Sequence, residues 1–172
     1  ALHEAINSSC PENASVVLKW PNDALLLVNG ELRKVGGVLV ESSSRGKVTR
    51  AILGIGCNVS STELHKNEYS IATLEEINEG ITLPEFERSI QASVASWFEQ
   101  KSGINDVKKK SFLEYYSEVF GTTLEVLGKP FYRGTEMKFN SIDTEGKMTL
   151  LEAPKKLHTI EDGELVIWSN YD

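Results

Sequence analysis

The sequence predicts an α+β fold in which an antiparallel or mixed sheet packs against helices and precedes a small β-barrel. Four strand patterns separated by turns fill residues 16–59, and apolar residues at helical spacing follow them. Beyond residue 120, short strand patterns alternate with glycine and proline turns, which is typical of a small barrel. We therefore predict two domains, residues 1–119 and residues 120–172.

Composition narrows the class of protein. Of the 172 residues, 40% are apolar and 25% are charged, as in ordinary globular proteins. The net charge of -7 disfavours nucleic acid as a partner, because a phosphate backbone needs a basic face. No apolar run approaches the ~20 residues of a membrane helix, and the first residues lack the pattern of a signal peptide. We expect a soluble, cytoplasmic protein that binds neither nucleic acid nor membranes.

The first predicted domain begins with a helix, indicated by apolar residues on one face of residues 1–6. An antiparallel meander follows, because the Asn29-Gly30 pair is suited to two positive φ angles and predicts a tight hairpin. Its four strands are expected at residues 16–20, 24–28, 32–42 and 48–59.

Helices are predicted next. Thr73 and Glu76 have the spacing of a capping box, and Pro84 suits the first turn of a longer helix that ends before Gly103. A third helix is expected over residues 106–119. The strands of the second domain are predicted at residues 123–127, 136–142, 147–152, 157–160 and 164–168.

Three motifs in the meander have residue types suited to chemistry. Lys19–Asp23 places a cation, an amide and a carboxylate at a strand end, although a simple Pro-Asn-Asp turn also explains it. Lys34 precedes Gly36 and Gly37, and glycines inside a strand usually mark a bulge or a close approach to the backbone.

The third motif runs from Gly54 to Val59. Strand alternation puts Gly54, Gly56 and Asn58 on one face, which forms a flat floor for a flat ligand. The pattern lacks the third glycine and the helix of a dinucleotide-binding fingerprint, so we reject a Rossmann fold. Cys57 is expected to face the core, as a packing residue and not a nucleophile.

Together and in this order, the three motifs resemble the signature blocks of biotin protein ligases, especially the eukaryotic type. The resemblance implies the biotin/lipoate ligase catalytic fold, which is similar to class II aminoacyl-tRNA synthetases, followed by an SH3-like barrel. It implies ATP-dependent attachment of biotin, with Mg²⁺, to a lysine of a biotin carboxyl carrier domain of carboxylases. The intermediate would be biotinyl-5'-AMP.

The resemblance also implies roles for individual residues. Biotin's carboxylate must attack the α-phosphate of ATP, and the approach of two anions requires a fixed cation or a metal. The implied catalytic residues are Lys34, Asp23 and Lys19, with Asp23 on the magnesium side and Lys34 also contacting biotin. The implied biotin pocket comprises Gly37, Val38, Leu39, Gly54 and Gly56, and the implied nucleotide-binding residues are Asn22 and Asn58.

One expected element is missing. The family's glycine- and arginine-rich loop, which closes over the adenylate, has no counterpart in this sequence, so we expect a fragment of a longer ligase. Two other functions stay open. One is a lipoate-protein ligase, which shares the catalytic fold, and the other is a non-catalytic module that recognises a carrier domain.

Overall fold

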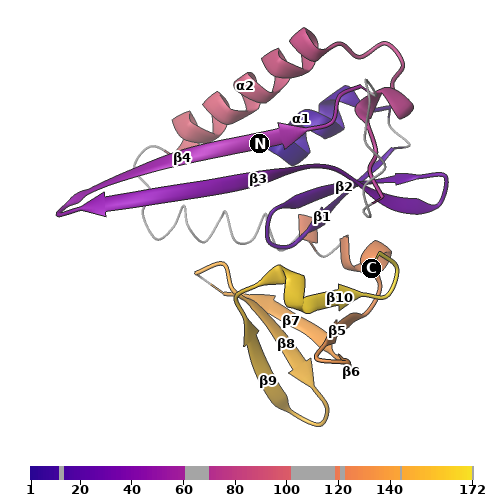
Figure 1. The fold of residues 1–172 in the computed structure, drawn as a ribbon, viewed down its shortest axis with the longest axis vertical. Coiled ribbons are helices and arrows are strands. Elements are labelled where there is room, and N and C mark those ends of the chain that lie inside the picture. Colours follow the sequence, from indigo (N-terminus) through magenta and orange to yellow (C-terminus); the bar gives the residue numbers. More distant parts are fainter. Residues whose placement is uncertain (12–13, 61–69, 102–118, 121–122, 144, 172) are drawn as a thin grey trace. The chain divides into compact units, whose positions relative to one another are not determined.

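The computed structural model describes residues 1–11, 14–60, 70–101, 119–120, 123–143 and 145–171 (Figure 1). The chain divides into two compact units. The first unit comprises Ala1–Val16 and Asn22–Trp97, and the second comprises Val17–Pro21 and Phe98–Asp172. The predicted domain boundary at residue 119 stays a prediction.

A four-stranded sheet in the order β1-β2-β3-β4 contains the three motifs. The β2–β3 and β3–β4 pairs are antiparallel, which confirms the predicted meander. Asn29 and Gly30 have φ angles of 54° and 85°, as a two-residue hairpin turn requires. The strands are β1 (Ser15–Lys19), β2 (Asp23–Val28), β3 (Glu31–Arg45) and β4 (Val48–Cys57).

A β-bulge interrupts the pairing of β2 with β3. Ala24 pairs with Gly36, but Leu25 pairs with Lys34, so Val35 is an extra residue in β3. In a regular strand, residues 34 and 37 would point to opposite faces. The extra residue changes this alternation, and Cε of Lys34 lies 3.8 Å from the position that a β-carbon on Gly37 would occupy.

The helices pack on the face of this sheet opposite to Lys34 and Gly37. They are α1 (Leu2–Ser9), the 3₁₀ helix η1 (Leu74–Glu76) and α2 (Leu83–Lys101), close to the predicted ranges. The predicted capping box of Thr73 and Glu76 is present. The helices and alternate sheet residues share one core, whose buried members are Leu2, Ala5, Ile6, Ala24, Leu26, Val28, Val35, Val59, Ala72, Leu74 and Phe86. None of the helices described has the length and apolar character needed to cross a membrane.

The second unit contains two antiparallel three-stranded sheets, in the orders β10-β5-β6 and β7-β8-β9. Trp168, Phe120 and Leu150 are among its fully buried residues. Its strands are β5 (Pro130–Tyr132), β6 (Thr135–Glu136), β7 (Lys138–Ile142), β8 (Met148–Glu152), β9 (Lys156–Ile160) and β10 (Val166–Trp168), with the 3₁₀ helix η2 (Gly163–Leu165) before β10. The α+β fold is confirmed, and closure into an SH3-like barrel stays a prediction.

One predicted strand of the second unit is wrong. Residues 123–127 are helical, and the N–H of Gly128 donates to the carbonyl of Leu124, 3.1 Å away. Gly128 has a φ of 80°, a left-handed conformation that closes a helix and favours glycine. The β-branched and apolar residues before Gly128 suggested a strand, but the glycine acts as a helix stop. The helix predicted over residues 106–119 lies almost wholly outside the described residues.

Candidate functional site

Lys34 and Asp23 form an ion pair on the face of the sheet opposite the helices. Nζ of Lys34 lies 2.6 Å from Oδ1 of Asp23, and the two side chains are 41% and 20% exposed. Asp23 begins β2 directly opposite Gly37 of β3, and the bulge brings Lys34 to the same face. The pair therefore offers a cation that solvent can reach, held beside a carboxylate.

Asn22 fixes the chain where it enters β2. Its Nδ2 donates to the carbonyl of Val38 over 3.0 Å, and the N–H of Val38 donates to the carbonyl of Asn22 over 2.9 Å. A β-carbon on Gly37 would lie 3.0 Å from Oδ1 of Asp23 and 3.2 Å from the carbonyl oxygen of Asn22. Glycine at position 37 thus allows the Asn22–Asp23 turn to lie against β3.

A strip of bare backbone extends from this pair across β3 and β4. Gly37 pairs with Gly56, and Leu39 pairs with Gly54, so the three glycines share one face with Leu39. No described atom lies within 4 Å of a β-carbon built on Gly56, and around Gly54 only Leu39 does. Leu39 itself is 63% exposed. We call the backbone of Gly37, Gly54 and Gly56 the glycine floor. The side chains of Asp23 and Lys34 lie against its Gly37 end, and its Gly56 end is open among the described residues.

The alternate residues of these strands face the helices. Ile55, Cys57 and Val38 all pack against the helix-side core. The position of Cys57 confirms the prediction that it is a packing residue. Val38 was expected to line the biotin pocket, but its side chain lies on the other face from Gly37 and Leu39. Only its backbone, bonded to Asn22, borders the candidate site.

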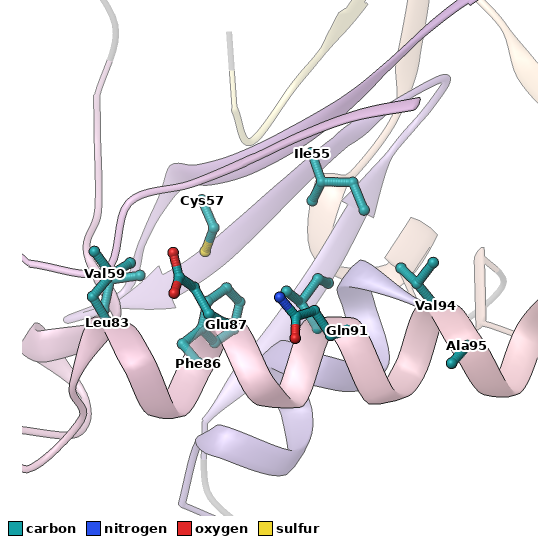
Figure 2. Close-up of a pocket in the computed structure, with 10 residues that line it drawn as sticks. Ile55, Cys57, Val59, Leu83, Phe86, Glu87, Gln91, Val94 and Ala95 are labelled. Atoms are coloured by element: carbon teal, nitrogen blue, oxygen red, sulfur yellow. The ribbon is translucent and has the colours of Figure 1, made fainter. Parts of the chain in front are cut away.

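A cavity of about 440 Å³ lies on this helix side, between β4 and α2 (Figure 2). Its lining is mostly apolar, and Glu87 is the charged residue in it. A carboxylate without a cation disfavours a phosphate-bearing ligand there. The lining residues are Ile55, Cys57, Val59, Leu83, Phe86, Glu87, Ile90, Gln91, Val94 and Ala95. The glycine floor and the Lys34–Asp23 pair lie on the opposite face of the sheet from this cavity.

Asn58 follows β4 and contacts the backbone of Lys34. Its Nδ2 lies 3.4 Å from the carbonyl oxygen of Lys34 and 3.3 Å from that of Ala72. Its own N–H donates to the carbonyl of Val35 over 2.7 Å. The amide therefore ties the end of β4 to β3 beside Lys34. Recognition of adenine by Asn58 stays a prediction.

Lys19 belongs to the second unit, where its Nζ lies 4.6 Å from the centroid of the Tyr171 ring. The neighbouring Trp20 is also bound within this unit, because its Nε1 donates to the carbonyl of Gly146 over 2.9 Å. The first motif is thus divided between the two units, with Asn22 and Asp23 in the first.

Arg33 and Glu76 form an ion pair next to Lys34 that the sequence analysis missed. The capping box indicated where Glu76 would lie, but nothing in the pattern linked it to Arg33. Burial alone would raise the pKa of Glu76. Hydrogen bonds from Arg33 and Thr73, together with the charge of Arg33, outweigh burial and hold the pKa below its ordinary value.

The described residues offer few ligands for a metal ion. Within the described part of the chain, no group of three or more His, Cys, Asp and Glu side chains could hold one. Mg²⁺ is often bound by one or two carboxylates together with substrate phosphates and water, so a complete protein cage is not required. Asp23 fits the role of a single carboxylate ligand of that kind.

Residues 1–58 match the biotin/lipoate A/B protein ligase family. This range includes all the site residues predicted from the sequence. Over 61 residues the chain is 44% identical to the biotin--[acetyl-CoA-carboxylase] ligase of Paracoccus denitrificans, a match that covers 35% of this chain and 24% of that protein.

Solved structures extend the likeness to nearly the whole chain. The biotin protein ligase of Aquifex aeolicus is 23% identical with a TM-score of 0.70, over 97% of this chain and 70% of that one. A mutant of the same ligase in complex with biotin gives 21% identity and a TM-score of 0.61, over 99% and 67% of the two chains. The chain thus has the fold of a biotin protein ligase, and the resemblance inferred from the motifs is confirmed.

Proposed function

We propose that this chain is part of a ligase that attaches biotin to a lysine of a biotin carboxyl carrier domain in an ATP-dependent reaction. The observation that carries the proposal is the Lys34–Asp23 pair at the end of the glycine floor. The floor offers flat backbone to a planar ligand, and the pair offers a cation where an anion would lie. A cytoplasmic location is part of the proposal.

The first step joins two anions. An oxygen of the biotin carboxylate attacks the α-phosphorus of ATP, and the bond to the β-phosphate breaks, which gives biotinyl-5'-AMP and pyrophosphate. Lys34 would offset the negative charge that accumulates between the carboxylate and the phosphate. Its flexible ammonium, already reachable by solvent, suits a charge that moves during the reaction. Asp23 would hold Lys34 in place and supply one oxygen to Mg²⁺, which would neutralise phosphate charge.

The second step transfers the biotinyl group. The neutral ε-amine of the carrier lysine attacks the acyl carbon, AMP leaves, and the amide nitrogen loses its extra proton. This step requires no enzyme nucleophile, so positioning and electrostatic stabilisation suffice. The raised pKa of Cys57, about 12 because of burial and the nearby Cys10, accords with a thiol that takes no part.

Two alternative functions have specific support. The family that matches residues 1–58 includes lipoate ligases, so lipoate is an alternative acyl substrate. The matched segment spans only 24% of the Paracoccus ligase, so the second alternative is a non-catalytic module, with the chemistry in other segments of the enzyme. In that case it would recognise the carrier and bind ligand without turnover.

Binding calorimetry with a stable analogue of biotinyl-AMP tests the proposal. Lys34→Ala should weaken binding at least ~10-fold, equivalent to about 1.4 kcal/mol. Lys47→Ala, at the exposed turn between β3 and β4, is the matched control and should leave the affinity unchanged. Equal affinities for the Lys34 variant and the wild type would contradict the proposal.

Two further measurements separate the alternatives. The first is a competition between biotin and lipoate for binding to the chain. Tighter binding of lipoate would favour a lipoate-protein ligase. Incubation with ATP, Mg²⁺, biotin and an acceptor domain, followed by mass spectrometry, tests turnover. A mass gain on the acceptor would exclude the non-catalytic module.

A further inference from the structure

Lys34 is held on both of its backbone edges. On one side it pairs with Leu25 of β2. On the other, its N–H donates to the carbonyl of Ser70, and its carbonyl accepts from the N–H of Ala72, both over 2.9 Å. These two bonds form an isolated parallel bridge between Lys34 and Ile71. The bulge interrupts the β2 ladder next to Lys34, so its position depends also on this bridge and on the Asn58 amide, 3.4 Å from the same carbonyl oxygen.

Arg33 fastens that bridge. Its Nη1 donates to the carbonyl of Ile71 over 3.2 Å, and its Nη2 pairs with Oε2 of Glu76. The other carboxylate oxygen of Glu76 accepts the N–H of Thr73 over 2.9 Å. One guanidinium thus connects β3 to the segment of residues 71–76 at two points.

We propose that Arg33 and Glu76 are positioning residues for Lys34, which hold the bridging segment against β3 and so set where the ammonium lies. The consequence for ligand binding rests on the proposed function. Arg33 and Glu76 would act without touching the substrate, because they hold the segment of residues 70–72 to which the backbone of Lys34 is bonded.

The geometry favours arginine over lysine at position 33. The planar guanidinium reaches Ile71 and Glu76 with separate N–H groups, whereas an ammonium is a single point charge on a flexible stem. A shift of the reacting groups by 1 Å can change a rate by about 100-fold. We call Arg33 and Glu76 the clamp. Its loss is therefore expected to act through the position of Lys34 more than through the stability of the chain.

A double-mutant cycle tests the coupling in the full chain. Calorimetry with the biotinyl-AMP analogue compares Arg33→Met, Lys34→Ala and the variant with both changes. Arg33→Met alone should weaken binding ~10-fold, and it should cause no further loss where Lys34 is already alanine. Arg33→Lys should restore part of the affinity, and the exposed Arg88→Met should leave it unchanged. Equal losses from Arg33→Met in both backgrounds would overturn the proposal.

Amide hydrogen exchange tests the clamp independently of any ligand, and so separates its failure from failure of the proposed function. Arg33→Met should speed exchange of the Lys34 and Ala72 amides ~10-fold and leave Val38 unchanged. Val38 lies on the same strand and is bonded to Asn22 instead. Unchanged exchange at Lys34 and Ala72, or an equal rise at Val38, would overturn the proposal. If the wild type binds no adenylate analogue, the proposed function fails while this measurement still decides the clamp.

Discussion

Lys34 and Gly37 share one face of the sheet although they are separated by an odd number of positions in β3. The Val35 bulge accounts for this, and it puts the Lys34 ammonium beside Asp23 at the end of the glycine floor. Without the bulge, strand alternation would direct Lys34 toward the helix-side core. The candidate site thus depends on an irregularity in the ladder.

Gly36 lies too close to β4 to accept a side chain. A β-carbon there would overlap the carbonyl oxygen of Gly56 and lie 3.2 Å from Cα of Cys57. We expect Gly36→Ala to lower the free energy of unfolding by about 1–3 kcal/mol, because the backbone of β4 must move. Urea denaturation measures the loss. Gly56→Ala, with no described atom within 4 Å, is the control and should change stability by less than ~0.5 kcal/mol. Equal stability of the two variants would contradict the close approach of Gly36 to the backbone of β4.

Gly56 is expected to matter for binding instead. Gly56→Val would place a branched side chain on the glycine floor, in open space, so the fold should persist while a planar ligand loses its contact. Calorimetry should show at least ~10-fold weaker binding of the biotinyl-AMP analogue. Ala51→Val, an exposed change on the opposite face of β4, should leave the affinity unaltered. An unchanged affinity in the Gly56 variant would place the ligand elsewhere.

The Glu76 carboxylate should make stability depend on pH. Its pKa is lower in the folded chain than in the unfolded chain, so the unfolded state takes up protons first as the pH falls. The stabilisation is fully present above the unfolded pKa of ~4.3 and disappears as the pH falls through the lower folded pKa.

Unfolding free energies of the wild type and Glu76→Gln, measured between pH 7 and pH 2, check this expectation. The advantage of the wild type should shrink only below about pH 5. Glu79→Gln, an exposed change nearby, serves as the control. An advantage that is constant across this range would show that the clamp does not lower the pKa of Glu76.

The two cysteines are expected to react slowly in the folded chain. Burial raises the pKa of the Cys10 thiol to about 11. Burial, with a smaller contribution from the charge of nearby Cys10, raises the pKa of the Cys57 thiol to about 12. Only the thiolate is a good nucleophile, so labelling by a disulfide reagent at pH 8 should be much slower than in denaturant. Cys57→Ser should retain binding of the adenylate analogue. Fast native labelling of Cys57 would contradict its packed position.

The sequence allowed most of the first unit to be predicted, because local signals agree with the fold there. Asn29-Gly30 determines the hairpin, and alternation correctly separated Cys57 from Gly56. The predicted biotin pocket includes the consecutive residues Gly37, Val38 and Leu39, but strand alternation puts Val38 on the face opposite the other two. A role for Val38 in binding biotin stays a prediction.

The remaining features depend on contacts that are distant in sequence. Arg33 and Glu76 are more than forty positions apart in the sequence, and no local pattern predicts their ion pair. Likewise, the bulge was indicated by two glycines, but only the register shows that Val35 is the extra residue. The helix at residues 123–127 was mistaken for a strand because β-branched residues outweighed the stop signal of Gly128.

The first motif also restricts how related proteins can be recombined. Trp20 donates to Gly146, and a β-carbon on Gly163 would collide with Pro21, so residues 17–21 are fitted to C-terminal partners. In a chimaera with another protein's C-terminal segment, the Trp20 indole would lose its matched partner at position 146 unless residues 17–21 are exchanged together with that segment. A single junction near residue 120 would separate residues 17–21 from the C-terminal residues of the same compact unit. Both segments should therefore be exchanged together.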